Sequence, residues 1–192
     1  RLAEEETIIR TGYSYYQRAD APFRNYSLQY LNRTIGLLQT GGLHRLSEET
    51  SITWQGGYTF SRREEPDFQR IRTVKEQGDS LFRIIIPPGA TTFDAARFYS
   101  TLQQTGLSLT TQLQTTLGGI QWQTGVQGDF RKRTFQARWF SYTLPLAAGN
   151  FLQTWSGTPV NQAFSPEYLP NFRLREGTNP TDRYSAEQAF AA

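Results

Sequence analysis

Apolar and polar residues alternate along much of this chain with a period of two, which is typical of a β-strand with two different faces. The clearest run is Gly119 to Arg133, where large apolar side chains alternate with Gln, Gly, Asp and Arg. Further runs cover residues 51–62 and 101–113, with weaker ones over 7–15 and 33–45 and a start near Tyr184. The pattern therefore predicts an all-β chain of about five to six strands. In the run over 33–45 we expect Ile35, Leu37 and Leu43 to share the apolar side, with Leu38 interrupting the alternation.

The connections between these runs alternate in length. Leu46–Glu49 and Gln114–Gly118 each join two runs within a few residues, which indicates antiparallel hairpins. The connections over 63–95 and 141–182 are much longer and contain several Pro and Gly residues. Bacterial outer-membrane barrels have this layout, with short periplasmic turns and long extracellular loops. We therefore expect periplasmic turns near 46–49 and 114–118, and extracellular loops near 63–95 and 141–182.

Period alone does not separate a soluble β-sandwich, whose apolar face is a core, from a membrane barrel, whose apolar face meets lipid. The runs of about 12 to 15 residues exceed the ~5–6 of ordinary strands and suffice for the ~9–11 that cross a bilayer. Rings also gather near strand ends, as in an interfacial aromatic belt. We predict antiparallel transmembrane β-barrel strands in residues 1–192. The residues expected to face lipid are Ile52, Trp54, Tyr58, Phe60, Ile120, Trp122, Val126 and Phe130.

Composition agrees with a two-faced β surface. Only 37% of residues are hydrophobic and the mean hydropathy is -0.58, yet there are 13 Phe, 10 Tyr and 4 Trp. The net charge is +3 and the basic residues are scattered, so nucleic acid is not expected as a partner. No apolar run approaches the roughly 20 residues of a membrane helix. Because barrels need at least about eight strands and the chain has no initiator Met, we expect part of a longer polypeptide or, failing that, a subunit of an oligomeric barrel.

Candidate chemistry is sparse. The chain has a single histidine, His44, and no cysteine, so neither a catalytic triad nor a Cys/His metal site is expected, and we predict no enzyme activity and no cofactor. Glu64, Glu65 and Asp67 form an acidic cluster that could bind a cation or act as paired acid and base. The neighbouring arginines and proline favour a solvated loop with local ion pairs. A contact with an extracellular ligand remains the alternative for these three carboxylates.

Two sequence motifs resemble the barrel region of TonB-dependent outer-membrane receptors. Gly42-Leu43-His44-Arg45-Leu46 matches a strand that reads G-x-H-x-L, and residues 54–67 match the following W-x-x-x-Y-x-x-S-x-x-x-E-P-D. Residues 97–100 and 125–140 are similar as well. The resemblance implies a 22-stranded barrel that is closed by an N-terminal plug and energised by the TonB complex. It also implies import of a bulky nutrient, such as a metal chelate, an oligosaccharide or a peptide, across the bacterial outer membrane.

The same resemblance implies lipid and lipopolysaccharide, the rest of the barrel, the plug, the TonB complex and a surface lipoprotein as partners. The plug and the TonB-contacting box are not found in this sequence. Two alternatives stay open. One is a non-transporting outer-membrane barrel, such as an adhesin, a scaffold or an accessory subunit. The other is a soluble β-sandwich that binds a ligand through Ser141–Asp182.

Overall fold

In the computed structural model the chain is described over residues 2–14, 21–75, 78, 80, 82–87, 89–144, 153–155, 165–166, 170 and 172–192. This part of the chain is almost wholly antiparallel β-structure, which confirms the predicted all-β class. Its short 3-10 turn, Pro180–Asp182, leads into the last strand. No helix among the described residues is long and apolar enough to cross a membrane.

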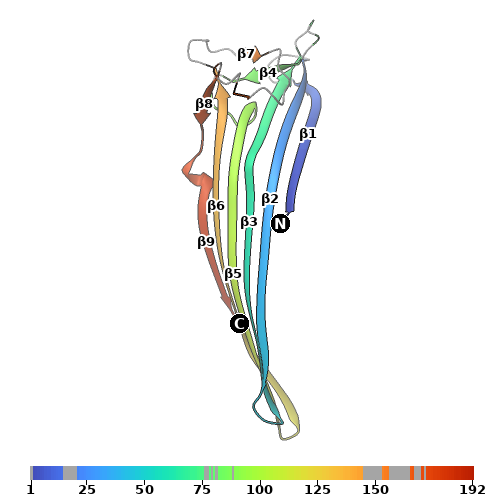
Figure 1. The fold of residues 1–192 in the computed structure, drawn as a ribbon, viewed down its shortest axis with the longest axis vertical. Coiled ribbons are helices and arrows are strands. Elements are labelled where there is room, and N and C mark those ends of the chain that lie inside the picture. The colour runs from blue at the N-terminus through green and yellow to red at the C-terminus, as the bar shows by residue number, and fades with distance from the viewer. Residues whose placement is uncertain are drawn as a thin grey trace.

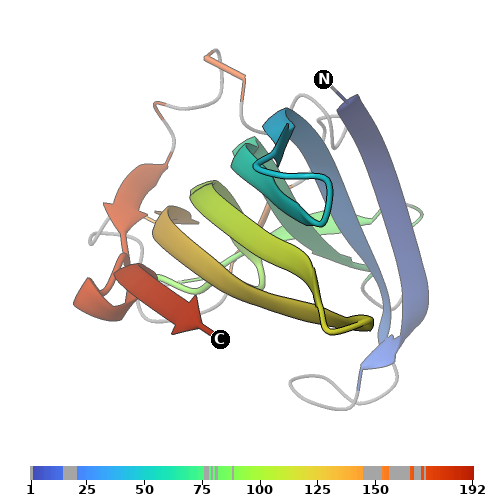
Figure 2. The same cartoon turned by 90° about the horizontal axis from the view of Figure 1, so that it is seen from below.

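One nine-stranded sheet holds the described strands together, and in Figures 1 and 2 it forms a long curved layer that does not close on itself. Its strands are β1 (Leu2–Ser14), β2 (Ala21–Arg45), β3 (Thr50–Val74), β4 (Arg83–Ile86), β5 (Ala95–Leu117), β6 (Ile120–Thr143), β7 (Gln153–Trp155), β8 (Arg173–Glu176) and β9 (Arg183–Ala191). The order is β1-β2-β3-β5-β6, with β8 and β9 both paired to the far edge of β6. The short strand β4 pairs with β3 and β7.

The six predicted strands are all present, but four of them are much longer than the alternation indicated. Strands β2, β3, β5 and β6 have 23–25 residues each. The predicted loop over 63–95 is therefore wrong in its first part, where β3 continues to Val74. Polar and charged residues occupy both faces there, so the hydrophobic signal disappears although the backbone pairing continues. The three short strands β4, β7 and β8 lie within segments that were expected to be loops.

The two tight turns lie at the same end of the sheet, and β4, β7 and β8 lie at the other (Figure 1). The first turn matches its prediction, since Leu46 and Ser47 donate backbone N–H groups to the Thr50 carbonyl at 2.9 and 3.2 Å. The second is shorter than predicted, because β5 continues to Leu117 and only Gly118 and Gly119 remain to turn the chain. Their φ angles of 61° and 78° are ones that glycine adopts without strain, as two-residue hairpins require.

Strand register places most of the long apolar side chains on one side of the sheet. Tyr58 is opposite Leu107, and Leu107 is opposite Phe130, so the three strands present these residues at one level. We name as the apolar face the side that carries Ile52, Trp54, Tyr58, Phe60, Leu107, Leu109, Leu113, Leu117, Ile120, Trp122, Val126 and Phe130. We name as the polar face the opposite side, with Thr53, Gln55, Thr59, Ser61, Gln104, Ser108, Thr110, Gln112, Gln123, Gln127, Asp129, Arg131 and Arg133.

Strand β2 departs from the prediction. Leu37 pairs with Thr59 and Leu38 with Tyr58, so the leucine that interrupted the alternation lies on the apolar face. The residues expected there, Ile35, Leu37 and Leu43, lie on the polar face instead. Small residues of β2 leave room for rings of β3 on the apolar face. At Gly36 an added Cβ would lie 1.9 Å from the Phe60 ring, so this ring lies directly over the glycine.

A bulge in β3 separates the two ends of the sheet. The pairing of β3 with β5 shifts its register between Glu65 and Phe68 of β3, and the pairing of β2 with β3 shifts between Leu28 and Asn32 of β2. Both shifts place one extra residue in β3 around Pro66. Proline has no backbone N–H to donate to a neighbouring strand, and bulges are among the places where sheets accept it. The extra residue exchanges the two faces of β3 beyond this point. Phe68 therefore lies on the polar face.

A small core of buried side chains lies at the end of the sheet away from the turns. It contains Ile71, Ile84, Ile86, Ala95 and Tyr142, each at most 4% exposed. These residues come from β3, β4, β5 and β6. The strand β4 pairs with the end of β3 and so brings Ile84 and Ile86 next to the other three residues. The described chain is thus well packed at this end, while the apolar face nearer the turns stays exposed.

Candidate functional site

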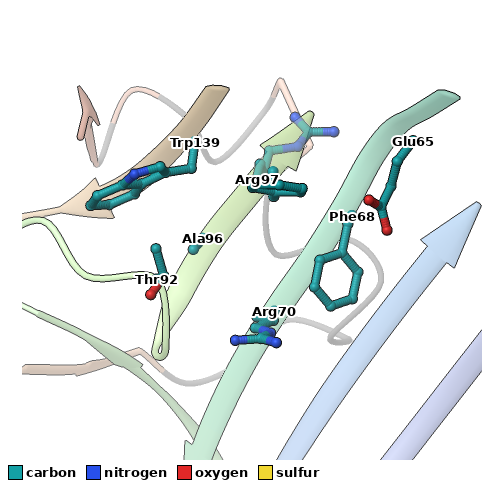
Figure 3. Close-up of a pocket in the computed structure, with 8 residues that line it drawn as sticks. Glu65, Phe68, Arg70, Thr92, Ala96, Arg97 and Trp139 are labelled. Atoms are coloured by element: carbon teal, nitrogen blue, oxygen red, sulfur yellow. The ribbon is translucent and has the colours of Figure 1, made fainter. Parts of the chain in front are cut away.

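A hollow of about 340 Å³ lies at the bulged end of the sheet (Figure 3). Its lining residues come from three neighbouring strands and the segment before β5: Glu65, Phe68, Arg70, Thr92, Ala96, Arg97, Phe98 and Trp139. Register places most of these side chains on the polar face. This hollow is at the lower end of the ~300–1,000 Å³ range of small-molecule pockets. It is the best candidate for a binding site in the described part of the chain.

Three aromatic residues form a row across the hollow. Phe68 is opposite Phe98, and Phe98 is opposite Trp139, so β3, β5 and β6 each contribute one ring at the same level. All three are partly exposed. Ala96 lies two residues before Phe98 on the same face of β5, opposite Arg70 and Ser141, and is only 4% exposed. A methyl side chain at this position, next to the aromatic row, leaves the space that forms the hollow.

Arg70 supplies a cation beside this row. It lies on the same face of β3 as Phe68, two residues further along, and its guanidinium carbon is 5.1 Å from the centroid of the Phe68 ring. This distance is within the range of a cation–π contact. Among the described residues no carboxylate lies within ion-pair distance of Arg70, whereas the ion pairs found use other arginines. Arg70 is therefore an exposed positive charge of the hollow that no described carboxylate pairs with.

Glu65 is the buried acid at the edge of the hollow, with only 5% of its surface exposed. Its Oε2 accepts a hydrogen bond from the Ser100 hydroxyl at 3.0 Å, and its Oε1 accepts one from the Gln29 amide. The Arg63 guanidinium is 3.8 Å from Oε2. Both oxygens are thus occupied by groups of β2, β3 and β5. Glu65 ties these strands together and offers little to a ligand.

Asp67 makes a two-point ion pair with Arg97. The guanidinium donates to both carboxylate oxygens, Nε to Oδ1 at 2.8 Å and Nη2 to Oδ2 at 2.5 Å. The Gln69 amide donates to the same carboxylate at 2.7 Å, and Arg97 also donates to the Tyr142 hydroxyl at 3.3 Å. The hydrogen bonds to Asp67 raise the pKa of Arg97 above its ordinary value, so this cation keeps its charge. The pair fixes the bulge of β3 against β5.

The three predicted acidic residues do not converge on one point. Glu64 lies on the apolar face, where it forms an ion pair with Arg62 at 2.5 Å and accepts a hydrogen bond from the Asn32 amide at 3.4 Å. Each carboxylate has its own cation, which agrees with the predicted local ion pairs. The expected solvated loop is wrong, because all three lie in β3. Within the described ranges no group of three or more His, Cys, Asp or Glu could hold a metal ion.

The backbone around Trp139 is held by the segment after β8. The Gly177 N–H donates to the Trp139 carbonyl at 3.1 Å, and the Trp139 N–H donates to the Thr178 hydroxyl at 3.1 Å. The Arg138 guanidinium donates to both oxygens of Glu176 at 2.9 Å. This hydrogen bonding lowers the pKa of Glu176 to about 2. The third ring of the hollow is therefore positioned by a second ion pair.

Most residues of the hollow were not singled out from the sequence. Trp139, Arg97 and Phe98 lie in the segments 97–100 and 125–140 that carry the family resemblance, which assigns none of them a role. Phe68 and Arg70 fall within the predicted loop over 63–95, whereas the structure places both in β3. The alternation of Ala96 and Phe98 continues that of β5 and could have placed both on its polar face. The position of Phe68 could not be obtained in this way, because it depends on the bulge.

The eight residues predicted to face lipid all lie on the apolar face. Six of them keep large exposed fractions, from 40% for Tyr58 to 67% for Val126, and the other two, Ile52 and Trp54, are partly exposed.

No protein-family model, curated protein or solved structure matches this chain.

Proposed function

We propose that this chain is part of the barrel of a TonB-dependent transporter, which imports a bulky nutrient across a bacterial outer membrane. The observation that carries the proposal is the apolar face. Its large side chains are in register across β3, β5 and β6, are mostly exposed, and are backed by a face of Gln, Thr, Ser and Arg. A soluble protein rarely exposes so continuous an apolar surface, whereas a membrane barrel presents it to lipid.

The length of the apolar band fits a bilayer. On β6 it extends from Ile120 to Phe130 and on β5 from Leu107 to Leu117, which are the ~9–11 residues of a tilted transmembrane strand. The next residue of β6 on this face is Lys132, which pairs with Glu187 of β9 at 2.9 Å. An ion pair at this level favours water or lipid headgroups over hydrocarbon. The long strands then continue beyond the membrane on the side away from the turns.

The open edges of the sheet support a larger assembly. Among the described residues β1 is paired only on its β2 side, and β9 only on its β6 side. An unpaired edge in hydrocarbon leaves backbone N–H and C=O groups without partners, at a cost of several kcal/mol each. Further strands must therefore flank this sheet if it lies in a membrane. In the proposal they belong to the rest of the barrel, with the plug inside it.

Import rather than catalysis is proposed because the acidic residues of the site are all engaged by local cations or amides. The partners proposed with this role are lipopolysaccharide around the barrel, the TonB complex and a surface lipoprotein. Each of these rests on the resemblance of residues 42–46 and 54–67 to TonB-dependent receptors.

The test is to isolate the natural polypeptide that contains this sequence. We expect it in the outer-membrane fraction, released by detergent and not by salt, with an intact mass several times 22.0 kDa. Release without detergent would contradict the membrane assignment. Uptake measured with and without the proton gradient that energises TonB then separates a transporter from an adhesin or scaffold. Uptake that does not respond to this gradient would contradict the transport assignment.

A further inference from the structure

We infer that the hollow around Arg70 binds a carboxylate or similar anion that is attached to a flat aromatic body. The inference rests on the proposed function in one respect, namely that this class of group is part of the imported cargo. In a barrel, the polar face lines the interior. A ligand that enters from the end away from the turns would therefore meet this hollow before the part of the sheet inside the bilayer.

The aromatic row provides the surface for a flat ligand. Phe68, Phe98 and Trp139 lie at one level on three adjacent strands, and Ala96 lies two residues before Phe98 on the same face of β5. Aromatic side chains favour offset-stacked or edge-to-face contact with another ring, which adds about 0.5–1.5 kcal/mol to the burial of its surface. A space of about 340 Å³ accommodates one or two fused rings rather than a whole bulky nutrient. The hollow therefore fits one aromatic group of a larger ligand.

Arg70 selects the charge of that ligand. Its guanidinium is exposed, is kept near the Phe68 ring and lacks a carboxylate partner among the described residues. A guanidinium presents several N–H donors that match the two oxygens of a carboxylate. Binding of an anion would give Arg70 the partner that the described residues do not supply.

A neutral sugar or a cationic group fits less well. A cation would need acceptors in the hollow, and a sugar needs them for its hydroxyl donors, but the available carboxylate, Glu65, is buried and already accepts hydrogen bonds from Gln29 and Ser100. The carboxylate of Asp67 is likewise held by Arg97. The groups that remain for a ligand are the donors of Arg70 and the hydroxyl of Thr92. The balance of donors over acceptors therefore favours an anion.

The inference is tested with 2-naphthoate and its neutral analogue 2-naphthalenemethanol, which share the ring system and differ in charge. Binding is measured by calorimetry on the complete natural polypeptide in detergent. We expect the naphthoate to bind at least tenfold more tightly than the alcohol. Arg70→Gln should remove this difference and leave the affinity for the alcohol unchanged. Arg133→Gln, which removes an exposed arginine of the same face outside the hollow, should retain the full difference.

A second variant tests the location. Ala96→Leu places a larger side chain in the hollow, opposite Arg70 and next to Phe98 on β5, so both probes should lose affinity while the charge of the site is unchanged. Circular dichroism confirms that each variant is folded. Equal affinity of the wild type for the two probes, or an undiminished preference for the naphthoate in Arg70→Gln, would overturn the inference. Preference for the anion in a polypeptide that is found outside the membrane would overturn the proposed function and leave the inference standing.

Discussion

The decisive perturbation is a charge placed in the middle of the apolar band. Val126 is 67% exposed on the apolar face and lies between Ile120 at the turn and Phe130 at the far limit of the band. If this face contacts lipid, arginine at this depth costs ~2–4 kcal/mol. That cost corresponds to a decrease of roughly 30-fold to 900-fold in the equilibrium constant for the assembled barrel. Gln127 is the matched control, since it is the next residue and lies on the polar face.

The assay compares Val126→Arg, Trp122→Arg and Gln127→Arg in the complete polypeptide. The folded fraction is measured from the migration of unheated samples in detergent electrophoresis and from unfolding in urea. We expect Val126→Arg to be the most damaging, Trp122→Arg to be intermediate because it lies nearer the turn end of the band, and Gln127→Arg to assemble normally. If Val126→Arg and Gln127→Arg assemble equally well, the apolar face does not contact lipid and the proposed function loses its main support.

Three further outcomes follow from particular contacts. Gly36→Ala should destabilise the protein by about 1–3 kcal/mol, because the new methyl group meets the Phe60 ring. Urea unfolding should show a smaller loss of stability when the same change is made in a Phe60→Ala background, and an equal loss in both backgrounds would contradict the contact. Asp67→Asn and Arg97→Gln should each destabilise the bulged end by about 1–3 kcal/mol, because each breaks the ion pair. The double variant should lose less stability than the sum of the two single losses, and additive losses would rule out the pair. The pKa of Glu176 is lowered from 4.5 to about 2 in the folded protein, so its contribution to stability is fully present above pH 4.5 and is lost as the pH falls towards 2. Over this interval the protection of the β8 amides, taken relative to their intrinsic exchange rates, should decrease. The Glu176→Gln variant should lack this pH dependence.

Many of the strands could be predicted from the sequence because the alternation of residue types along a strand defines its two faces. The alternation over Gly119–Arg133 correctly gave a strand with an apolar and a polar side, and the short link at 46–49 correctly gave a hairpin. The predictions failed where local chemistry ceased to distinguish the faces. Residues 63–74 carry charges on both sides, yet they stay in the sheet because each acid finds a partner on a neighbouring strand or on β3 itself.

The candidate site was largely invisible in the sequence for a related reason. Glu64, Glu65 and Asp67 are close along the chain and suggested one acidic cluster, but alternation and the bulge direct them to different partners. Conversely, Phe68 and Trp139 are far apart in the chain and line one hollow only because their strands pair with β5 in one register. Proximity in the sequence was a poor guide to proximity in the site.

By itself, the sequence determined that the chain forms long antiparallel strands with one apolar side, because side-chain direction in a strand alternates from residue to residue and needs no tertiary contact. Only the tertiary structure decided which faces of neighbouring strands lie on the same side of the sheet. Register placed Leu38, and not Leu37, with Tyr58, and the extra residue near Pro66 exchanged the faces of β3. A shift of one residue moves every side chain of a strand to the opposite face. The aromatic row beside Arg70 is therefore a property of how the strands pair, and of no single segment alone.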